Sequence, residues 1–134
     1  MGALPAGGDD AAMKIFIVDD SKPIRSRLAA MVRAMEGVEL VGEAVNARDA
    51  MMGITGLAPH SVLLDLGLPD GSGMDVLRKL HPIHPGIAFI VLTNHSEPQY
   101  RRACERAGAA YFLDKSTEFD KVPQIVRQIA ATRH

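Results

Sequence analysis

The stretch Ile15-Phe16-Ile17-Val18-Asp19-Asp20 decides the fold of this chain, because four consecutive apolar residues run directly into two carboxylates. A strand in a parallel sheet that is covered on both faces is apolar throughout, whereas a half-exposed strand alternates apolar and polar residues. The run Ser61 to Leu64 has a similar form and ends at a third carboxylate, Asp65. The two runs therefore predict buried strands that carry acidic side chains at their ends.

Strands and helices are expected to alternate along the rest of the chain. Asn46 and Ser72 are suited to cap two of the helices, and Ser96 followed three residues later by Gln99 is typical of a capping box. The expected strands are Ile15–Val18, Val38–Glu43, Ser61–Leu64, Ile87–Leu92 and Ala110–Leu113, and the expected helices run from about Pro23 to Gly37, from Ala47 to about Leu57, from Ser72 to His81, from Ser96 to Gly108 and over much of Glu118–Thr132. Since parallel neighbours need a crossover and helices supply it, five such repeats predict an α/β fold with a parallel five-stranded sheet.

The composition is that of an ordinary single domain. The chain has 134 residues, of which 47% are hydrophobic and 23% charged, and its formal net charge is −1, so no basic footprint predicts nucleic-acid binding by this chain alone. No apolar run approaches the roughly 20 residues that span a bilayer, which predicts no membrane association. A single cysteine, Cys104, excludes an intramolecular disulfide and suits a cytoplasmic location. Residues 1–13 are expected to be a disordered tail, and residues 14–134 the folded domain.

Two further polar residues lie at predicted strand ends. Thr93 follows the run Ala88 to Leu92, and Lys115 comes shortly after the last predicted strand. Because the carboxyl ends of parallel strands meet at one edge, where such folds bind ligands, acid, hydroxyl and ammonium groups should share one cleft. Transfer of a phosphoryl group to a carboxylate brings anion toward anion, and Mg²⁺ held by one or two carboxylates neutralises that charge. The pattern therefore predicts a Mg²⁺-assisted phosphoacceptor.

These residues resemble the receiver domain of two-component response regulators over Lys14 to about Ala131, which makes residues 14–134 the receiver domain. The resemblance rests on the residues at the strand ends and on the punctuation between them: Asp19-Asp20, Asp65, Leu68-Pro69-x-x-Ser72-Gly73, Thr93, Gly108-Ala109 and Lys115. It implies a flavodoxin-like (βα)5 sandwich with strand order 2-1-3-4-5. It further implies that Asp65 takes a phosphoryl group from a sensor histidine kinase or a histidine phosphotransfer protein.

The resemblance also implies a role for each site residue. Asp20, Asp65 and the Gly67 carbonyl would ligate Mg²⁺, with Asp19 acting through water. Lys115 would hold the phosphoryl group from the other side.

A switch and a set of tuning positions follow from the same resemblance. Thr93 would move toward the phosphoryl group and Phe112 would fill the vacated space. That movement would reshape the surface of the helix ending at Gly108, the strand Ala110–Leu113 and the last helix, and so alter binding of a downstream protein target. Gly67, Asn94 and His95 occupy positions that tune the phosphate lifetime in receivers.

Two other functions compete with that of a stand-alone signalling switch. The chain could be a receiver excised from a longer DNA-binding regulator. It could also be a Mg²⁺-dependent phosphohydrolase with an aspartate nucleophile, but such enzymes place a second carboxylate two residues after the nucleophile, where this chain has Gly67. We therefore expect no enzyme activity beyond self-phosphorylation and self-dephosphorylation.

Overall fold

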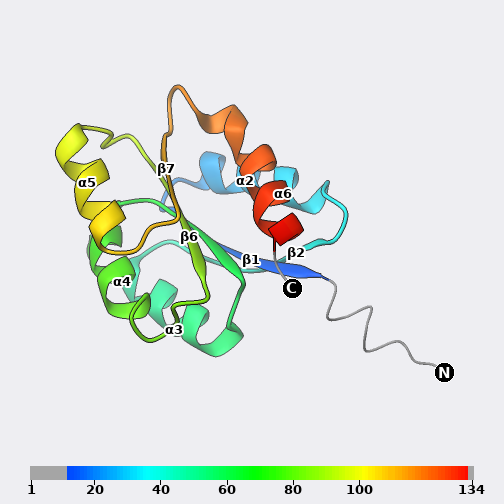
Figure 1. Ribbon diagram of the computed structural model, residues 1–134, viewed down its shortest axis with the longest axis horizontal. Helices are drawn as coiled ribbons and strands as arrows, with labels where there is room; N and C mark the ends of the chain where they lie inside the picture. Colours follow the sequence, from blue (N-terminus) through cyan, green and yellow to red (C-terminus); the bar gives the residue numbers. More distant parts are fainter. Residues whose placement is uncertain (1–11, 133–134) are drawn as a thin grey trace.

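The computed structural model describes residues 12–132 and confirms the predicted α/β fold. Five parallel strands form one sheet in the order β2-β1-β3-β6-β7, and the helices lie in two layers on its faces (Figure 1). The two remaining strands, β4 and β5, have two residues each and pair only with one another. When the five strands of the main sheet are numbered by themselves along the chain, their order in the sheet is the predicted 2-1-3-4-5.

The elements alternate as the sequence predicts. The strands are β1 (Met13–Val18), β2 (Val38–Ala44), β3 (Ser61–Leu64), β4 (Gly67–Leu68), β5 (Gly71–Ser72), β6 (Ala88–Thr93) and β7 (Tyr111–Asp114). The helices are α2 (Lys22–Arg33), α3 (Ala47–Leu57), α4 (Gly73–Leu80), α5 (Pro98–Arg106), the 3-10 turn η1 (Phe119–Lys121) and α6 (Val122–Thr132). No helix within residues 12–132 has the length and apolar character needed to cross a bilayer.

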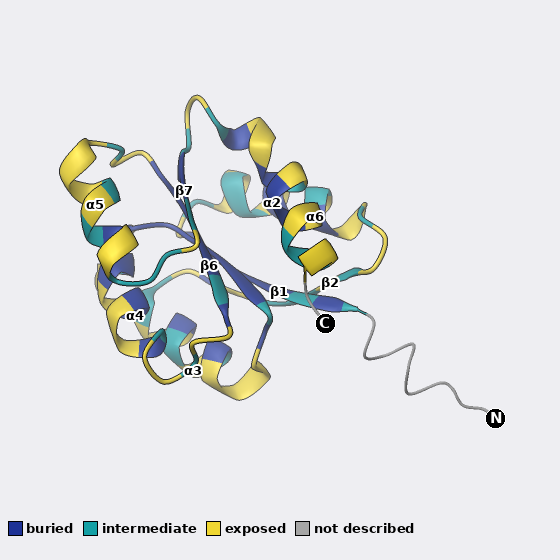
Figure 2. Cartoon of the chain, viewed as in Figure 1, coloured by how far each residue is buried: buried dark blue, intermediate teal, exposed yellow. Residues whose placement is uncertain are grey.

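The continuous apolar runs form strands because successive side chains point to opposite faces of the sheet, and both faces are covered. Phe16 and Val18 of β1 join one buried cluster, together with residues of α3, α4 and α5. Ile15 and Ile17 join the second cluster, together with residues of α2, η1 and α6. The inner strands β1, β3 and β6 are accordingly buried, whereas the edge strand β2 and the outer faces of the helices are more exposed (Figure 2).

Two of the three predicted helix caps are confirmed. The Asn46 side chain accepts a hydrogen bond from the Asp49 amide at 2.7 Å, and the Ser72 hydroxyl accepts one from the Met74 amide at 3.0 Å. The capping box of Ser96 and Gln99 is wrong: α5 begins after Glu97, and no side-chain hydrogen bond caps it.

Some boundaries differ from the sequence prediction. Strand β1 begins at Met13, whose side chain is fully buried, so this residue belongs to the domain and not to the tail. Strand β7 covers Tyr111–Asp114, one residue later than the predicted Ala110–Leu113. The rest of the predicted tail, apart from residue 12, lies outside the described residues.

Candidate functional site

Four strands deliver polar side chains to one edge of the sheet. Strand β3 pairs with β1 and β6, and β7 pairs with the outer side of β6, all in parallel. Asp65 follows the central strand β3, and its amide donates a 3.0 Å hydrogen bond to the Val18 carbonyl at the end of β1. The Lys115 amide donates to the Thr93 carbonyl at 2.8 Å. These backbone bonds bring the strand ends to one level, as the parallel arrangement predicts.

Lys115 bridges two of the carboxylates. Its ammonium group lies 2.7 Å from Asp19 Oδ2 and 2.9 Å from Asp65 Oδ2. The three side chains are 2–9% exposed, so these ion pairs are shielded from water. Burial on its own would lower the pKa of Lys115, but the hydrogen bonds to Asp19 and Asp65 and the charges of these carboxylates outweigh it and raise the pKa. Lys115 is therefore a fixed positive charge beside Asp65.

The three acidic residues form one cluster with different environments. Asp19, Asp20 and Asp65 offer carboxylate oxygens that all lie within 4.8 Å of one another. Asp19 is buried and accepts a hydrogen bond from the Ser21 amide at 2.8 Å in addition to that from Lys115. Asp20 is exposed, and its side chain forms no hydrogen bond within residues 12–132. Asp20 is thus the carboxylate of the cluster that is open to a ligand.

This donor set suits Mg²⁺. The ion prefers hard oxygen ligands at roughly 2.0–2.1 Å and keeps several of its waters, so it needs few protein ligands and an open side. Three clustered carboxylates, one of them exposed and without a partner in the described part of the chain, provide both. Oxygens held this close repel one another, and a divalent cation relieves that repulsion.

Thr93 and Phe112 are both buried near this edge. Thr93 has no exposed surface, and its hydroxyl oxygen accepts a hydrogen bond from the His95 amide at 3.1 Å. Phe112 is 6% exposed. The Arg101 guanidinium lies 4.7 Å from the centre of its ring and donates a 3.2 Å hydrogen bond to its carbonyl oxygen. Arg101 therefore ties Phe112 to helix α5.

The three predicted tuning residues are exposed and follow closely after Asp65 or Thr93 in the chain. Asn94 and His95 follow β6 and are exposed. A Cβ atom added to Gly67 would lie 3.5 Å from the His95 ring, so this ring faces Gly67. The Gly67 amide also points toward Asp65, with 3.4 Å between the nitrogen and Asp65 Oδ1.

The structure gives three residues contacts at the site that the sequence analysis did not predict. Gly73 packs so close to the acceptor loop that a Cβ atom there would run into the Asp65 carbonyl oxygen. Asp70, at the tip of the β4–β5 hairpin, accepts hydrogen bonds from the amides of Ala47 and Arg48, at 2.7 and 3.0 Å. These bonds, that of Ala47 first, lower the pKa of Asp70. The glycine after Ser72 and the acidic residue Asp70 in the turn are visible in the sequence, but the sequence does not identify the distant residues that they contact.

The third of these residues is Asp114, the last residue of β7. Hydrogen bonding from the Ser96 hydroxyl and from Ser116 lowers the pKa of Asp114 to about 2. Ser96 is thus associated with Asp114 at the end of β7, and its side chain does not cap α5. The carboxylate joins the loop after β6 to the loop after β7, on either side of the site.

Comparison with known proteins identifies similar chains. The family model described as "Response regulator receiver domain" matches residues 15–127. Response regulator GacA of Pseudomonas aeruginosa is 30% identical over 119 residues, which cover 89% of this chain and 56% of GacA. The DNA-binding transcriptional activator DevR/DosR of Mycobacterium tuberculosis is 28% identical over 121 residues, with 90% and 56% covered. The chain thus spans about half the length of these curated relatives.

Solved structures share the fold. The signal receiver domain of the putative response regulator NarL from Mycobacterium tuberculosis has a TM-score of 0.82 at 24% identity, with 91% of this chain and 98% of that chain covered. A CheX–CheY complex with BeF3 and Mg from Borrelia burgdorferi has a TM-score of 0.82 at 22% identity, with 90% and 92% covered.

Proposed function

The chain belongs to the response regulator receiver domain family, and on that premise we propose that Asp65 is its phosphoacceptor in a two-component phosphorelay. The observation that carries the proposal is the Lys115 ammonium, held between Asp19 and Asp65 beside a third, exposed carboxylate. The donor is the phosphohistidine of a sensor histidine kinase or of a histidine phosphotransfer protein. The product is an aspartyl phosphate that changes how the chain binds a downstream protein target.

In the transfer, an oxygen of Asp65 attacks phosphorus as the bond from phosphorus to the donor's imidazole nitrogen breaks. The released imidazole nitrogen keeps the electron pair and can take up a proton. Lys115 lies 2.9 Å from Asp65 Oδ2 and can follow the charge onto the phosphoryl oxygens with little movement. Bound Mg²⁺ would neutralise further charge on acceptor and phosphoryl group, held by Asp20, Asp65 and the Gly67 carbonyl, with Asp19 acting through water.

The switch starts at Thr93. Its hydroxyl oxygen accepts from the His95 amide, so its hydrogen is available for a phosphoryl oxygen. A shift of Thr93 would open space for Phe112, and any movement of Phe112 must change its contact with Arg101. The proposed readout is therefore the surface formed by α5, β7 and α6. A partner that prefers one arrangement of this surface shifts the population toward it, and it raises phosphate occupancy by the same coupling.

The lifetime of the aspartyl phosphate is proposed to depend on Gly67, Asn94 and His95. Asn94 and His95 are exposed directly after Thr93, and the His95 ring faces Gly67, whose amide points toward Asp65. These side chains can control how water approaches the phosphoryl group.

A phosphohydrolase is the weaker proposal, because the described part of the chain carries no carboxylate two residues after Asp65, where Gly67 stands. Relatives in this family include enzymes: the protein-glutamate methylesterase/protein-glutamine glutaminase 1 of Carboxydothermus hydrogenoformans is 35% identical over 111 residues, which cover 32% of that protein. We propose that the part of this chain that matches the methylesterase is a signalling domain and not an enzyme.

DevR/DosR is described as a DNA-binding activator, and a role for this chain within such a regulator is the alternative proposal. We also propose a cytoplasmic location, since a lone, buried cysteine suits a reducing compartment.

The test is intact mass after exposure to acetyl phosphate with and without Mg²⁺. We expect the unmodified chain to gain one phosphoryl group when Mg²⁺ is present, and Asp65→Asn to gain none. Asp75→Asn is the matched control, because Asp75 is an exposed acid on α4 that lies outside the cluster. Labelling of Asp65→Asn at the rate of the control would place the acceptor elsewhere.

A further inference from the structure

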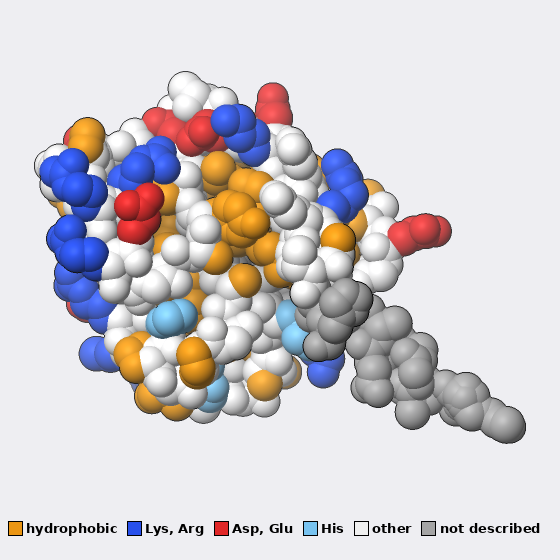
Figure 3. All heavy atoms as spheres, viewed as in Figure 1, with side chains coloured by type: hydrophobic (Ala, Val, Ile, Leu, Met, Phe, Trp, Pro, Cys, Tyr) orange, Lys and Arg blue, Asp and Glu red, His pale blue; other side chains and the backbone are white. Residues whose placement is uncertain are grey.

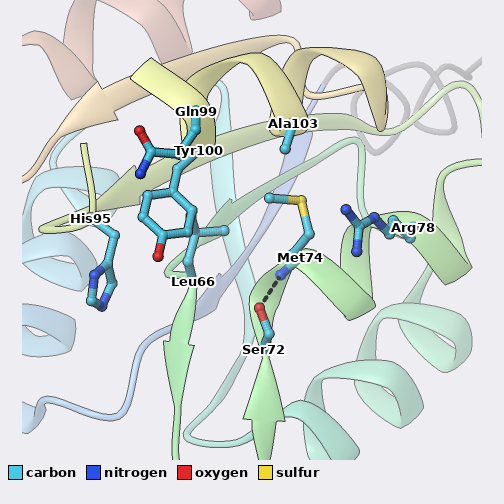
Figure 4. A pocket seen from close by; sticks show the side chains of 8 residues that line it. All are labelled: Leu66, Ser72, Met74, Arg78, His95, Gln99, Tyr100 and Ala103. Carbon is cyan, nitrogen blue, oxygen red and sulfur yellow. Dashed lines mark hydrogen bonds between the residues drawn. The ribbon is translucent and has the colours of Figure 1, made fainter. Parts of the chain in front are cut away.

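A groove lies between α4 and α5, next to the acidic cluster but separate from it. Its volume is about 430 Å³, within the range of roughly 300–1,000 Å³ that is usual for ligand pockets. Leu66, Met74 and Ala103 give it an apolar lining, and Arg78, Gln99 and Tyr100 are among its polar residues. Figure 4 shows Arg78 at one end, and Gln99 and Tyr100 near His95 at the other.

The polar side chains of this groove are open to a partner. Arg78 and Gln99 are exposed, and neither side chain forms a hydrogen bond or ion pair with another residue within 12–132. Tyr100 is 40% exposed, although its ring lies against that of His95. An apolar lining flanked by unused donors matches a ligand with an apolar group and an acceptor, and the guanidinium of Arg78 favours a carboxylate.

The charge around the groove extends beyond it. Helices α4 and α5 carry five basic side chains and two acidic ones: Arg78, Lys79, Arg101, Arg102 and Arg106 against Asp75 and Glu105. Arg102 and Arg106 follow Gln99 by three and seven residues, which places them on the same side of α5 as the groove. Lys and Arg side chains gather along this side of the molecule, although the whole chain has a formal net charge of −1 (Figure 3).

We propose that this groove binds an acidic segment of a partner protein, which inserts an apolar side chain over Met74 and pairs a carboxylate with Arg78. The basic rim favours a protein segment over a small molecule, because Arg102 and Arg106 add charge outside the groove. The apolar lining and the interspersed acids favour it over nucleic acid, whose phosphates match a continuous basic stripe. A groove between two helices also suits side chains presented at helical spacing.

The groove shares residues with the loops of the phosphoacceptor site. Leu66 directly follows Asp65, and His95 lies two residues after Thr93. A rearrangement of these loops would therefore change the groove, and the occupied groove would bias the loops in return. This coupling rests on the proposed function, whereas binding to the unphosphorylated chain does not.

The experiment selects short random-sequence peptides on the full chain, without phosphodonor or Mg²⁺, and measures their affinity for variants. We expect selected peptides to combine Asp or Glu with a large apolar residue. Arg78→Glu and Gln99→Glu should each weaken their binding about tenfold or more, because the first places an acid against the carboxylate and the second adds negative charge at the other end of the groove, facing an acidic segment. Arg78→Lys should retain most of the affinity. Arg127→Glu is the control, because Arg127 is an exposed arginine on α6, across the sheet.

Three outcomes would overturn the inference: selected peptides without acidic enrichment, peptides that bind Arg78→Glu as well as the Arg127→Glu control, and a DNA oligonucleotide that displaces them from the groove. Repeating the titration after acetyl phosphate treatment tests the coupling separately. An unchanged affinity on a chain shown by mass to be phosphorylated would refute the coupling and leave the groove assignment standing.

Discussion

Replacing Lys115 by methionine should destabilise the folded chain strongly at neutral pH. Methionine keeps most of the length and apolar stem of the side chain but removes the ammonium that lies 2.7 Å from Asp19 and 2.9 Å from Asp65. The variant must then either bury two close carboxylates without a counter-charge or take up a proton on one of them.

The free-energy cost of protonating one aspartate sets an upper limit to the destabilisation of Lys115→Met. Removing one member of a buried ion pair typically costs about 3–5 kcal/mol. An aspartate of ordinary pKa takes up a proton at pH 7 at a cost of about 4 kcal/mol, so the variant can avoid any larger penalty by protonation. We expect a loss of about 3–4 kcal/mol in the free energy of unfolding. Because the native variant then binds a proton that the unfolded chain does not, the loss should shrink as the pH falls toward about 4.

Urea unfolding at pH 7 and at about pH 4 to 5 measures this loss. Lys121→Met is the matched control, because Lys121 pairs with Glu118 at 2.9 Å but is 58% exposed, and such a pair contributes about 1 kcal/mol at most. Mg²⁺ should stabilise Lys115→Met more than the unmodified chain, since no ammonium competes for the carboxylates. A loss below about 1 kcal/mol, equal to that of the control and independent of pH, would refute the buried bridge.

Gly73→Ala should lower the free energy of unfolding by about 1–3 kcal/mol and slow phosphorylation, because the added Cβ meets the Asp65 carbonyl and only backbone can give way. Gly56→Ala in α3 is the control and should raise the free energy of unfolding by about 0.5–1 kcal/mol, which urea unfolding of both variants measures. Asp114→Ala should lower the free energy of unfolding at pH 7. This difference from the unmodified chain should disappear as the pH falls through the lowered pKa of about 2, because the carboxylate stabilises the fold only while it is ionised. A difference in unfolding free energy that persists below that pH would contradict this cause. Asp20→Asn should weaken Mg²⁺ binding, measured as the Mg²⁺-dependent rise in melting temperature, because it replaces the exposed carboxylate of the cluster; an unchanged rise would exclude Asp20 as a ligand.

Much of the fold was predictable because both faces of the sheet are covered. Four-residue runs such as 15–18 then become apolar throughout, and the helices between them leave no choice but parallel pairing. The positions of Asp65 and Lys115 could also be predicted, because parallel pairing places the carboxyl ends of all strands at one edge of the sheet.

Other features depend on contacts that no local pattern records. The β4–β5 hairpin has two residues in each strand, which is too short for any period to appear. Ser96 has the sequence of a helix cap, but its hydroxyl interacts with Asp114 instead. Asp70 caps α3 from 22 and 23 residues downstream. Ser96 and Asp70 thus interact with residues far along the chain, which the local sequence does not identify.

The bridge between Lys115 and Asp19 joins residues that are 96 positions apart in the chain. During synthesis, a ribosome therefore completes β1 and β3 long before the compensating cation exists. Until β7 and Lys115 are synthesised, Asp19 and Asp65 lack the ammonium that pairs with them, and the sheet lacks its edge strand β7. Assembly of the site should then be a late event in folding, and chains that terminate before Lys115 should be the ones that proteases remove.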